Sequence, residues 1–372
     1  MTRFTSAELE DALSRMERFK GSESISSDSV EFGLGPTVPT FKKTSMSLSN
    51  FASVWARGEP LVVTDCVLQG RWTPEDLSRR HGTTKVKIVD CQTNSQTNST
   101  LSQFFETFAE DPATRHTILK LKDWPPNDRL EDVLPDLYRA FEKGVPFPDY
   151  TTADGIYNLA SHFPHHGVRP DLGPKMYIAH GTSNLPSEDC RGSTRLHLDL
   201  TSAVNLALYA GKTIDGAPGY ALWHLFPPSS LGRVRDYIRK DVDSKSTGDP
   251  IHNQETYLTP SMLHVLAEEY GVTPYTIHQY PGQAVFIPAG CAHQVSNQAD
   301  AIKIACDFIS AENLDCTAQV WRELRVQRLV SQYGDDVLQL ESCLWHAWNS
   351  LSGIREELEA EGMSRTPPDR AI

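Results

Sequence analysis

The sequence lacks several features that define common classes of protein. No apolar run approaches the roughly 20 residues that a membrane-spanning helix requires, and the polar first residues do not resemble a signal peptide. The seven cysteines are scattered without a C-x-x-C pair, which argues against a disulfide framework and a structural zinc site. No dense cluster of lysine and arginine marks a nuclear import signal. We therefore expect an intracellular, soluble protein without a membrane partner, and these features do not separate nucleus from cytoplasm.

Positive charge is also in short supply. The chain has 35 Lys and Arg against 48 Asp and Glu, which gives a formal net charge of -13 at pH 7. Sequence-independent DNA binding needs a basic face that displaces counterions, so the acidic balance argues against it, and we expect no direct sequence-specific DNA binding. An acidic surface suits a basic peptide substrate, although many soluble proteins carry such a charge only to stay soluble.

The 372 residues are enough for a large core, either as one domain with appended elements or as two domains. We expect an N-terminal helix and flexible connector over residues 1–40, and a mixed α/β part over 41–165. A strand-rich core over 166–312 and C-terminal helices over 313–372 follow. Helical flanks around a strand-rich middle predict a β-barrel or a double-sheet jelly roll.

Local patterns place individual elements inside these parts. Apolar residues at three- and four-residue spacing predict helices, and short apolar or alternating runs between turn residues predict strands. The expected strands are 60–65, 86–90, 117–121 and 283–287, with further short strands between 177 and 308. The expected helices are 1–20, 101–108, 128–145, 228–240, 259–270, 320–333 and 337–358.

Two short segments carry the strongest functional signal. In the first, Leu196–Leu200, a histidine and an aspartate alternate with leucines. Side chains of an extended strand have a period of two, so His197 and Asp199 share one face while the leucines take the other. The second segment follows an expected strand with a tight Pro-Ala-Gly turn and delivers His293 at the end of a later strand. Two histidines and a carboxylate on one side of a metal form the facial triad of non-haem Fe(II) oxygenases.

Two alternatives stand beside this interpretation. The chain has 13 histidines, and a buried histidine is more often a hydrogen-bonded core residue than a metal ligand. Zinc also accepts two histidines and a carboxylate, although a catalytic zinc site usually keeps only one open position. Against the first alternative, a polar pair on the inward face of an apolar strand is costly to bury without a partner or a metal.

Polar residues near the triad suit a second, anionic ligand such as a chelating 2-oxo acid. Thr194 precedes the first histidine by three residues. Lys303 lies in a strand between isoleucines, so it points either into an interior polar pocket or into solvent. Lys212 competes for the same role but lies in a Gly/Asp-rich loop. Asn205, in the strand after Asp199, needs partners if it is buried, and either a cosubstrate or the backbone could supply them.

Several longer segments resemble the JmjC domain of histone lysine demethylases. The similarity is greatest to the subfamily that acts on lysine 9 of histone H3 and includes the hairless protein. It covers roughly residues 47–330, and the first and last 40 residues resemble no family. The segments that carry it are Leu119–Pro126, Tyr157–Ser161, Arg169–Tyr177, Thr194–Tyr209 and Val285–Phe308.

The resemblance implies a double-stranded β-helix (a cupin-like jelly roll) that uses Fe(II), 2-oxoglutarate and O₂. It implies that His197, Asp199 and His293 bind the iron. Thr194 matches the hydroxyl that contacts 2-oxoglutarate, and Asn205 and Tyr177 match polar positions of the same pocket. Many JmjC enzymes place the carboxylate-binding lysine on the strand that here contains Ala221–Trp223, which has none. Lys303 is the expected substitute, as in related oxygenases with a basic residue after the distal histidine.

By the same resemblance, the expected reaction is demethylation of N-methyl-lysine in histone H3 through hydroxylation and formaldehyde release. The substrate would be a methylated histone tail or another basic protein, and the compartment the nucleus. A JmjC hydroxylase whose product stays attached, and a non-catalytic chromatin-binding jelly roll, are the alternatives. The animal subfamily carries a cysteine-rich zinc module that this chain lacks, so the target lysine, its methylation state and the recruiting partner remain open.

Overall fold

The computed structural model describes residues 36–110, 115, 117–126, 128–164, 167–182, 192–244, 247–330 and 336–360, together with Ala7 and Glu10. The helix expected over residues 1–20 lies outside these residues except for Ala7 and Glu10, which are helical. The expected connector also falls mostly outside them.

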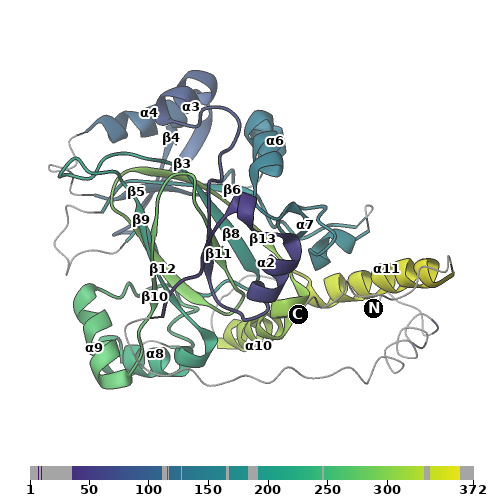
Figure 1. Cartoon of the computed structure of the whole chain (residues 1–372). Coiled ribbons are helices and arrows are strands. Elements are labelled where there is room, and N and C mark those ends of the chain that lie inside the picture. Colours follow the sequence, from purple (N-terminus) through teal and green to yellow (C-terminus); the bar gives the residue numbers. More distant parts are fainter. Residues whose placement is uncertain are drawn as a thin grey trace.

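Two β-sheets face each other and form the centre of the molecule (Figure 1). The larger sheet has nine strands in the order β1-β2-β11-β8-β13-β6-β5-β3-β4, and the smaller has four in the order β10-β9-β12-β7. The strands of the larger sheet are β1 (Thr40–Lys42), β2 (Leu61–Thr64), β3 (Lys85–Asp90), β4 (Gln96–Thr100), β5 (Leu119–Trp124), β6 (Lys175–Ala179), β8 (Ser202–Ala210), β11 (Ala284–Ile287) and β13 (Ala301–Phe308). Those of the smaller sheet are β7 (Thr194–His197), β9 (Ala221–Phe226), β10 (Tyr275–Gln279) and β12 (Ala292–Asn297).

From β6 to β13 the chain passes back and forth between the two sheets. β6, β8, β11 and β13 lie in the larger sheet, and β7, β9, β10 and β12 lie in the smaller one. Apolar side chains from both inner faces, among them Trp223, Val285 and Val295, pack into a shared core. This arrangement is the double-stranded β-helix, so the predicted fold class is confirmed.

Helices cover the outer faces and both ends of the sheets, as the helical flanks predicted. The α-helices are α2 (Leu48–Trp55), α3 (Pro74–His81), α4 (Leu101–Glu106), α5 (Leu130–Val133), α6 (Pro135–Gly144), α7 (Pro148–Thr151), α8 (Leu231–Tyr237), α9 (Pro260–Tyr270), α10 (Leu314–Val330) and α11 (Leu340–Ala360). Shorter 3-10 turns are Lys43–Ser45, Thr107–Ala109, Leu159–His162, Pro228–Ser230 and Ala311–Asn313, and Ile238–Val242 is a π-helical turn. No helix in the described part of the chain is long and apolar enough to cross a membrane.

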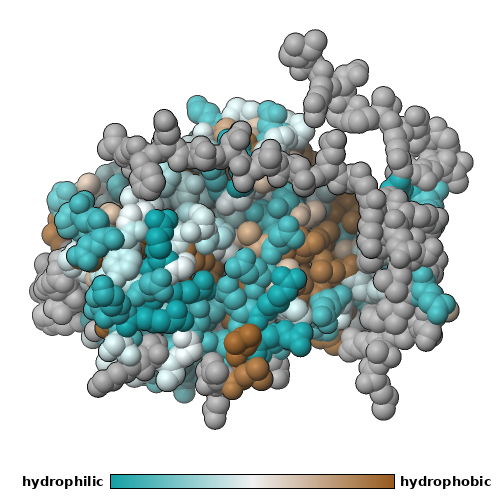
Figure 2. Space-filling model, turned by 90° about the horizontal axis from the view of Figure 1, so that it is seen from below, coloured by the Kyte–Doolittle hydropathy of each residue, from teal (hydrophilic) through white to brown (hydrophobic). Residues whose placement is uncertain are grey.

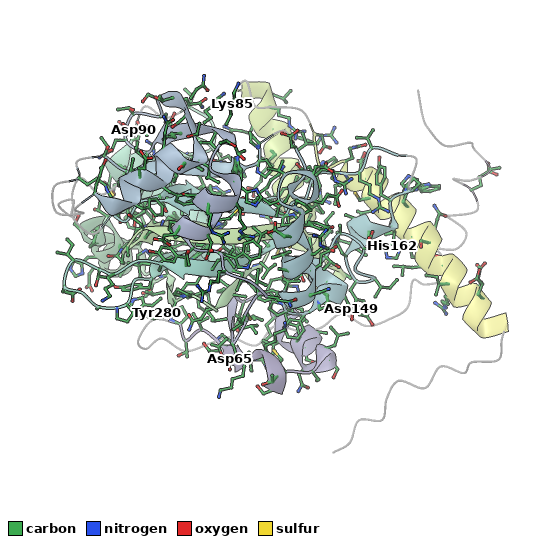
Figure 3. The ribbon with its side chains drawn as sticks, turned by 90° about the horizontal axis from the view of Figure 1, so that it is seen from above. Asp65, Lys85, Asp90, Asp149, His162 and Tyr280 are labelled. Atoms are coloured by element: carbon green, nitrogen blue, oxygen red, sulfur yellow. The ribbon has the colours of Figure 1, made fainter. Side chains whose placement is uncertain are left out.

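The helices differ in what they cover. Apolar residues of α8, α9 and α10 pack against the outer side of the smaller sheet around Leu196 and Phe226. α11 projects from the body (Figure 1) and is attached through the turn at His162, whose Nδ1 lies 2.9 Å from Ser350 Oγ. Seen from above, the labelled His162 lies beside this helix, while Lys85 and Asp90 of β3 lie on the other side of the molecule (Figure 3). The face seen from below is mostly hydrophilic, with apolar side chains gathered in smaller patches (Figure 2).

Three elements of the structure differ from the sequence prediction. The prediction of a single helix over 128–145 is wrong. The structure has two helices there, because α5 ends at Val133 and α6 begins at Pro135. A proline lacks the N–H that would continue the helix, and it forces Leu134 before it out of the helical region, to a φ of -133°. Strand β4 has no apolar alternation in its sequence and was not predicted. α10 begins at Leu314 rather than at residue 320.

Trp55 joins the N-terminal region to the jelly roll. Its side chain is fully buried, and its ring centroid lies 5.9 Å from that of Phe286 and 5.7 Å from that of Phe308. The indole Nε1–H donates a hydrogen bond to Ser310 Oγ at 3.0 Å. Because the aromatic contacts reach β11 and β13, this residue couples α2 to two strands of the jelly roll.

We predict that Trp55→Ala lowers the free energy of unfolding by about 3–5 kcal/mol, since it leaves a large cavity and an unpaired hydroxyl. Chemical denaturation of the full chain measures this. Asn50→Ala changes an exposed position on the same helix and is expected to shift the value by less than about 0.5 kcal/mol. A loss under about 1 kcal/mol for Trp55→Ala would show that α2 is not coupled to the sheet.

Candidate metal centre and adjoining cavity

Three ligand-type side chains meet between the two sheets. His197 is the last residue of β7, Asp199 lies two residues beyond in the following loop, and His293 is the second residue of β12. β7 and β12 pair with His293 directly opposite His197. The expected strand through residue 200 is therefore too long, and the second histidine opens a strand instead of ending one. The leucines still alternate as predicted, because Leu196 and Leu198 are buried in the helix-covered cluster on the other face.

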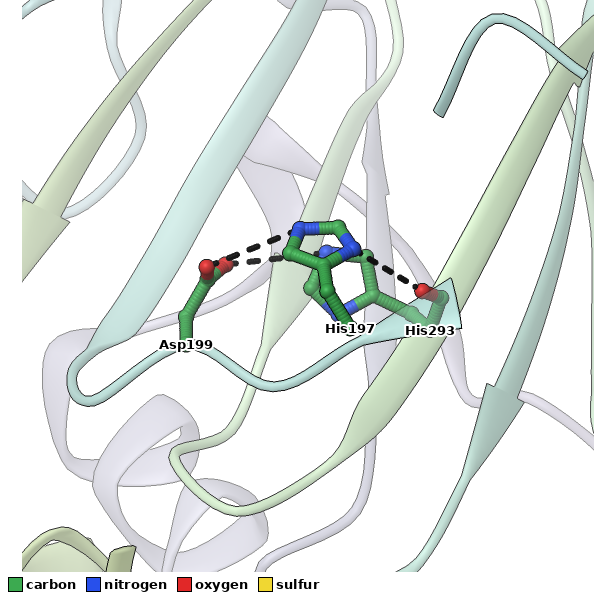
Figure 4. A group of neighbouring side chains, drawn as sticks. All are labelled: His197, Asp199 and His293. Carbon is green, nitrogen blue, oxygen red and sulfur yellow. Dashed lines mark hydrogen bonds and ion pairs between the residues drawn. The ribbon is translucent and has the colours of Figure 1, made fainter. Parts of the chain in front are cut away.

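The three side chains point toward one another (Figure 4). Asp199 Oδ1 lies 3.6 Å from His197 Nε2, and Asp199 Oδ2 lies 3.6 Å from His293 Nε2. The two imidazole centroids are 4.2 Å apart. Asp199 is 35% exposed and the histidines are more buried, so the cluster is open on the carboxylate side.

Backbone carbonyls orient both imidazoles. His197 Nδ1 lies 2.9 Å from Arg195 O and 3.1 Å from His293 O, and His293 Nδ1 lies 3.1 Å from Cys291 O. A carbonyl oxygen only accepts, so each Nδ1 carries a proton and Nε2 is the ring nitrogen that can offer a lone pair to a metal. Burial, together with neighbouring His197, lowers the pKa of His293 to about 4. That ring is therefore neutral near pH 7, as a metal ligand must be.

This donor set fits a divalent metal. One atom from each of the three residues lies within 4.8 Å of the other two. Two neutral imidazole nitrogens and one carboxylate on a single side leave the remaining coordination positions free. The hydrogen bonds at Nδ1 are the outer-shell contacts that hold metal-binding histidines in place.

A second group with suitable residue types, Asp249, His252 and Glu323, differs from the first. Arg235 donates to Asp249 Oδ2 at 2.6 Å and to Glu323 Oε2 at 2.6 Å, and His252 Nε2 lies 3.0 Å from the same Glu323 oxygen. The guanidinium already supplies the positive charge that these carboxylates require. This group is an ion-pair network that joins α8 to α10.

A cavity of about 550 Å³ adjoins the His-Asp-His cluster. All of the residues predicted for the site line it: Tyr177, Thr194, His197, Asp199, Asn205, His293 and Lys303. The structure therefore brings together side chains from five strands and a loop, spread over more than a hundred residues of sequence. Lys120 and Arg195 add positive charge to the lining, and Asp307 adds negative charge.

Lys303 points into this cavity and not into solvent. The residue is 5% exposed, and its Nζ donates a hydrogen bond to Asn297 Oδ1 at 2.9 Å. Removal from water disfavours the charged amine and lowers the pKa of Lys303 to about 7. Lys212, the competitor, is exposed in its loop.

A β-bulge brings Thr194 to the cavity. Thr194 and His197 are three residues apart, so a regular strand would place them on opposite faces. The pairing of β12 with β7 is irregular between His293 and Val295, where two residues of β12 span three of β7. The extra residue re-aims the strand, and both side chains line the cavity.

Asn205 and Tyr177 flank Lys303 across neighbouring strands. Tyr177 is the β6 partner of Lys303 in register, and Asn205 pairs with Ala305 of the same strand. The side chain of Gln279 donates to Asn205 O at 2.8 Å and lies 3.4 Å from Asn205 Oδ1. Asn205 is therefore buried with a side-chain partner, whereas the sequence had suggested a cosubstrate or the backbone.

The cavity is also lined by Asn297 and Trp223, which were not predicted from the sequence. Asn297 follows His293 by four positions on β12, so the period of two could have placed both on one face. Trp223 gave no such signal, because a tryptophan in an apolar strand is ordinarily a core residue.

Comparisons with known proteins agree with this geometry. A family model described as "JmjC domain, hydroxylase" matches residues 208–308, which include His293 and Lys303. Lysine-specific demethylase 3A of Gallus gallus is 34% identical over 348 residues, 82% of this chain. This chain therefore contains a JmjC domain.

Further JmjC relatives show the same extent of similarity. Lysine-specific demethylase 3A of Homo sapiens is 34% identical over 340 residues, 80% of this chain and 26% of the relative. Lysine-specific demethylase 3 of Drosophila melanogaster is 34% identical over 343 residues, 80% of this chain and 40% of the relative. The chain thus spans about a quarter of the vertebrate relatives it matches.

We predict that the purified chain binds one Mn(II) ion and that His293→Ala weakens this binding by about 100-fold or more, because a ligand is lost. Isothermal titration calorimetry measures the affinity. His252→Ala is the matched control, since it removes a histidine from the other cluster. Equal weakening by both substitutions would contradict the assignment of the ion to the His197, Asp199 and His293 cluster.

Proposed function

We propose that this chain is an Fe(II)- and 2-oxoglutarate-dependent dioxygenase that demethylates N-methyl-lysine in histone H3. The observation that carries the proposal is the His-Asp-His cluster and the buried cation Lys303, which line one cavity. The names of the JmjC relatives, lysine-specific demethylases, support the reaction and substrate class. We further propose a methylated histone tail as partner and the nucleus as compartment, as the resemblance to histone lysine demethylases implies.

In this proposal His197, Asp199 and His293 hold the iron. When bound, Fe(II) and 2-oxoglutarate supply the oxidising chemistry with O₂, which the side chains of this chain cannot supply themselves. Lys303 pairs with the far carboxylate of 2-oxoglutarate, and the Thr194 hydroxyl donates to the same group. Asn205 and Tyr177 complete the polar wall of the cosubstrate pocket.

The remaining role of the chain is to position the substrate and exclude water. The methyl group of the lysine approaches from the side of Asp199, where the cluster is open. Hydroxylation of that methyl group gives an N-hydroxymethyl lysine, which releases formaldehyde and leaves the lysine with one methyl group fewer. O₂ and 2-oxoglutarate are consumed, and succinate and CO₂ are formed, so the atoms balance. The net charge of -13 favours encounter with a basic histone tail.

A second candidate is hydroxylation without demethylation. The description of the matching family model, "JmjC domain, hydroxylase", favours it. The fold, the metal centre and the cosubstrate pocket would be the same. Only the substrate atom differs, since a hydroxyl group on a carbon not attached to nitrogen stays in place.

Incubation with Fe(II), 2-oxoglutarate and a panel of methylated histone H3 peptides distinguishes the two candidates. We predict a loss of one methyl group by mass spectrometry and the release of formaldehyde. His197→Ala should lower turnover by about 1,000-fold or more, because without the bound metal O₂ is not activated. An oxygen gain without methyl loss would favour the hydroxylase, and full activity of His197→Ala would overturn the metal assignment.

The lowered pKa of Lys303 predicts a pH-dependent affinity for 2-oxoglutarate. Below a pH of about 7 the amine is charged and pairs with the carboxylate, and above it an increasing fraction is neutral. The KM for 2-oxoglutarate should therefore rise several-fold between pH 6.5 and pH 8.5. In Lys303→Met the KM should be high at both values, and an unchanged KM across this range in the wild type would contradict the assigned role.

A further inference from the structure

Trp223 contacts both halves of the proposed site. It lies on β9, between β10 and β12, and is 3% exposed with its side chain lining the cavity. Its ring stacks on the His293 imidazole, with centroids 5.8 Å apart and planes 28° from parallel. The Nζ of Lys303 lies 5.5 Å from the centroid of the same indole. One rigid side chain therefore spans from a candidate metal ligand to the buried cation.

The indole is held in place by a buried amide. Its Nε1–H donates a hydrogen bond to Gln279 Oε1 at 2.9 Å. Gln279 is 1% exposed, and its Nε2 donates to Asn205 O at 2.8 Å and to Gln283 O at 3.1 Å. Both the oxygen and the nitrogen of this amide are hydrogen-bonded, so the indole cannot change its orientation without breaking a buried hydrogen bond.

The charged form of Lys303 has few polar groups around it, so the indole ring contributes much of its stabilisation. Its Nζ donates to the neutral Asn297 Oδ1, and among the described residues no carboxylate forms an ion pair with it. A desolvated ammonium near an aromatic face gains electrostatic stabilisation from the negative potential of that face. Without the indole, the cation would have one amide oxygen to hold its position and charge.

We propose that Trp223 is a positioning residue that holds the Lys303 ammonium beside the metal centre, so that the site selects 2-oxo acids with a second carboxylate. The inference rests on the proposed function, because it assigns a role within the cosubstrate pocket. It adds a residue that acts through Lys303 and does not itself bond to the ligand. Its effect is therefore confined to ligands that reach Lys303.

Calorimetry with Mn(II)-loaded protein tests this without turnover. The probes are 2-oxoglutarate and 2-oxobutyrate, which share the chelating 2-oxo acid but differ in the second carboxylate. Trp223→Leu is expected to weaken 2-oxoglutarate binding roughly five- to thirtyfold, as loss of a desolvated cation–π contact implies, and to leave 2-oxobutyrate binding within about twofold. Trp223→Phe keeps an aromatic face and should fall between wild type and Trp223→Leu. Leu222→Ala, on the same strand with its side chain on the opposite face, is the matched control.

A double-mutant cycle separates positioning from general damage to the fold. If Trp223 acts through Lys303, Trp223→Leu has less than about a twofold effect on 2-oxoglutarate binding in a Lys303→Met background. An undiminished effect in that background, or equal weakening for both probes, overturns the inference. So does wild-type affinity in Trp223→Leu. If the wild type binds neither probe, the proposed function itself fails. If the wild type binds 2-oxoglutarate and Trp223→Leu binds it equally well, only the role of Trp223 is overturned.

Discussion

The cost of burying polar and charged groups between two apolar sheets is the constraint on which the site depends. An unpartnered imidazole, ammonium or carboxylate in such an interior would destabilise the fold. Each group meets this cost differently. Burial keeps the His293 ring neutral, and the Nδ1 atoms of both histidines donate to backbone carbonyls, whereas Lys303 has an amide oxygen and an aromatic face. Asp199 remains partly exposed at the open side. The unused lone pairs at both Nε2 atoms are what make the cluster fit for a metal.

The double-stranded β-helix satisfies this constraint with few irregularities. Because the chain passes back and forth between the sheets, His197 and His293 come from neighbouring strands of the smaller sheet, while Lys303 comes from the larger one. The bulge in β7 adds Thr194 to the same cavity. Apolar side chains on the outer face of the smaller sheet, such as Leu196, pack under α8, α9 and α10 and hold the ligand strands in place. The helical layer thus supports the candidate metal centre without contributing a residue to it.

The sequence could predict much of this because period-two alternation is a local property. Strand alternation placed His197 and Asp199 on one face, and the jelly roll followed from the strand-rich middle with its helical flanks. For Lys303 the same pattern left an interior pocket and solvent as alternatives. Where tertiary contacts determine the ends of strands and helices, the local sequence pattern was insufficient to predict them. No apolar alternation marks β4, Pro135 divides a helix that periodicity alone would continue, and the strand ends at His197 although Leu198 and Leu200 keep its alternation. Trp223 could not be distinguished from a core tryptophan, since its contacts with His293 and Lys303 exist only in the folded chain.

The central claim is that this cavity couples oxidation of 2-oxoglutarate to removal of a methyl group from lysine. The most direct measurement is the ratio of formaldehyde to succinate formed with a methylated histone H3 peptide, corrected for succinate formed without peptide. If each oxidation removes one methyl group, the two products form in equal amounts, each dependent on peptide. Peptide-dependent succinate without formaldehyde would contradict demethylation, and the absence of both products with every methylated peptide would contradict the proposed enzyme.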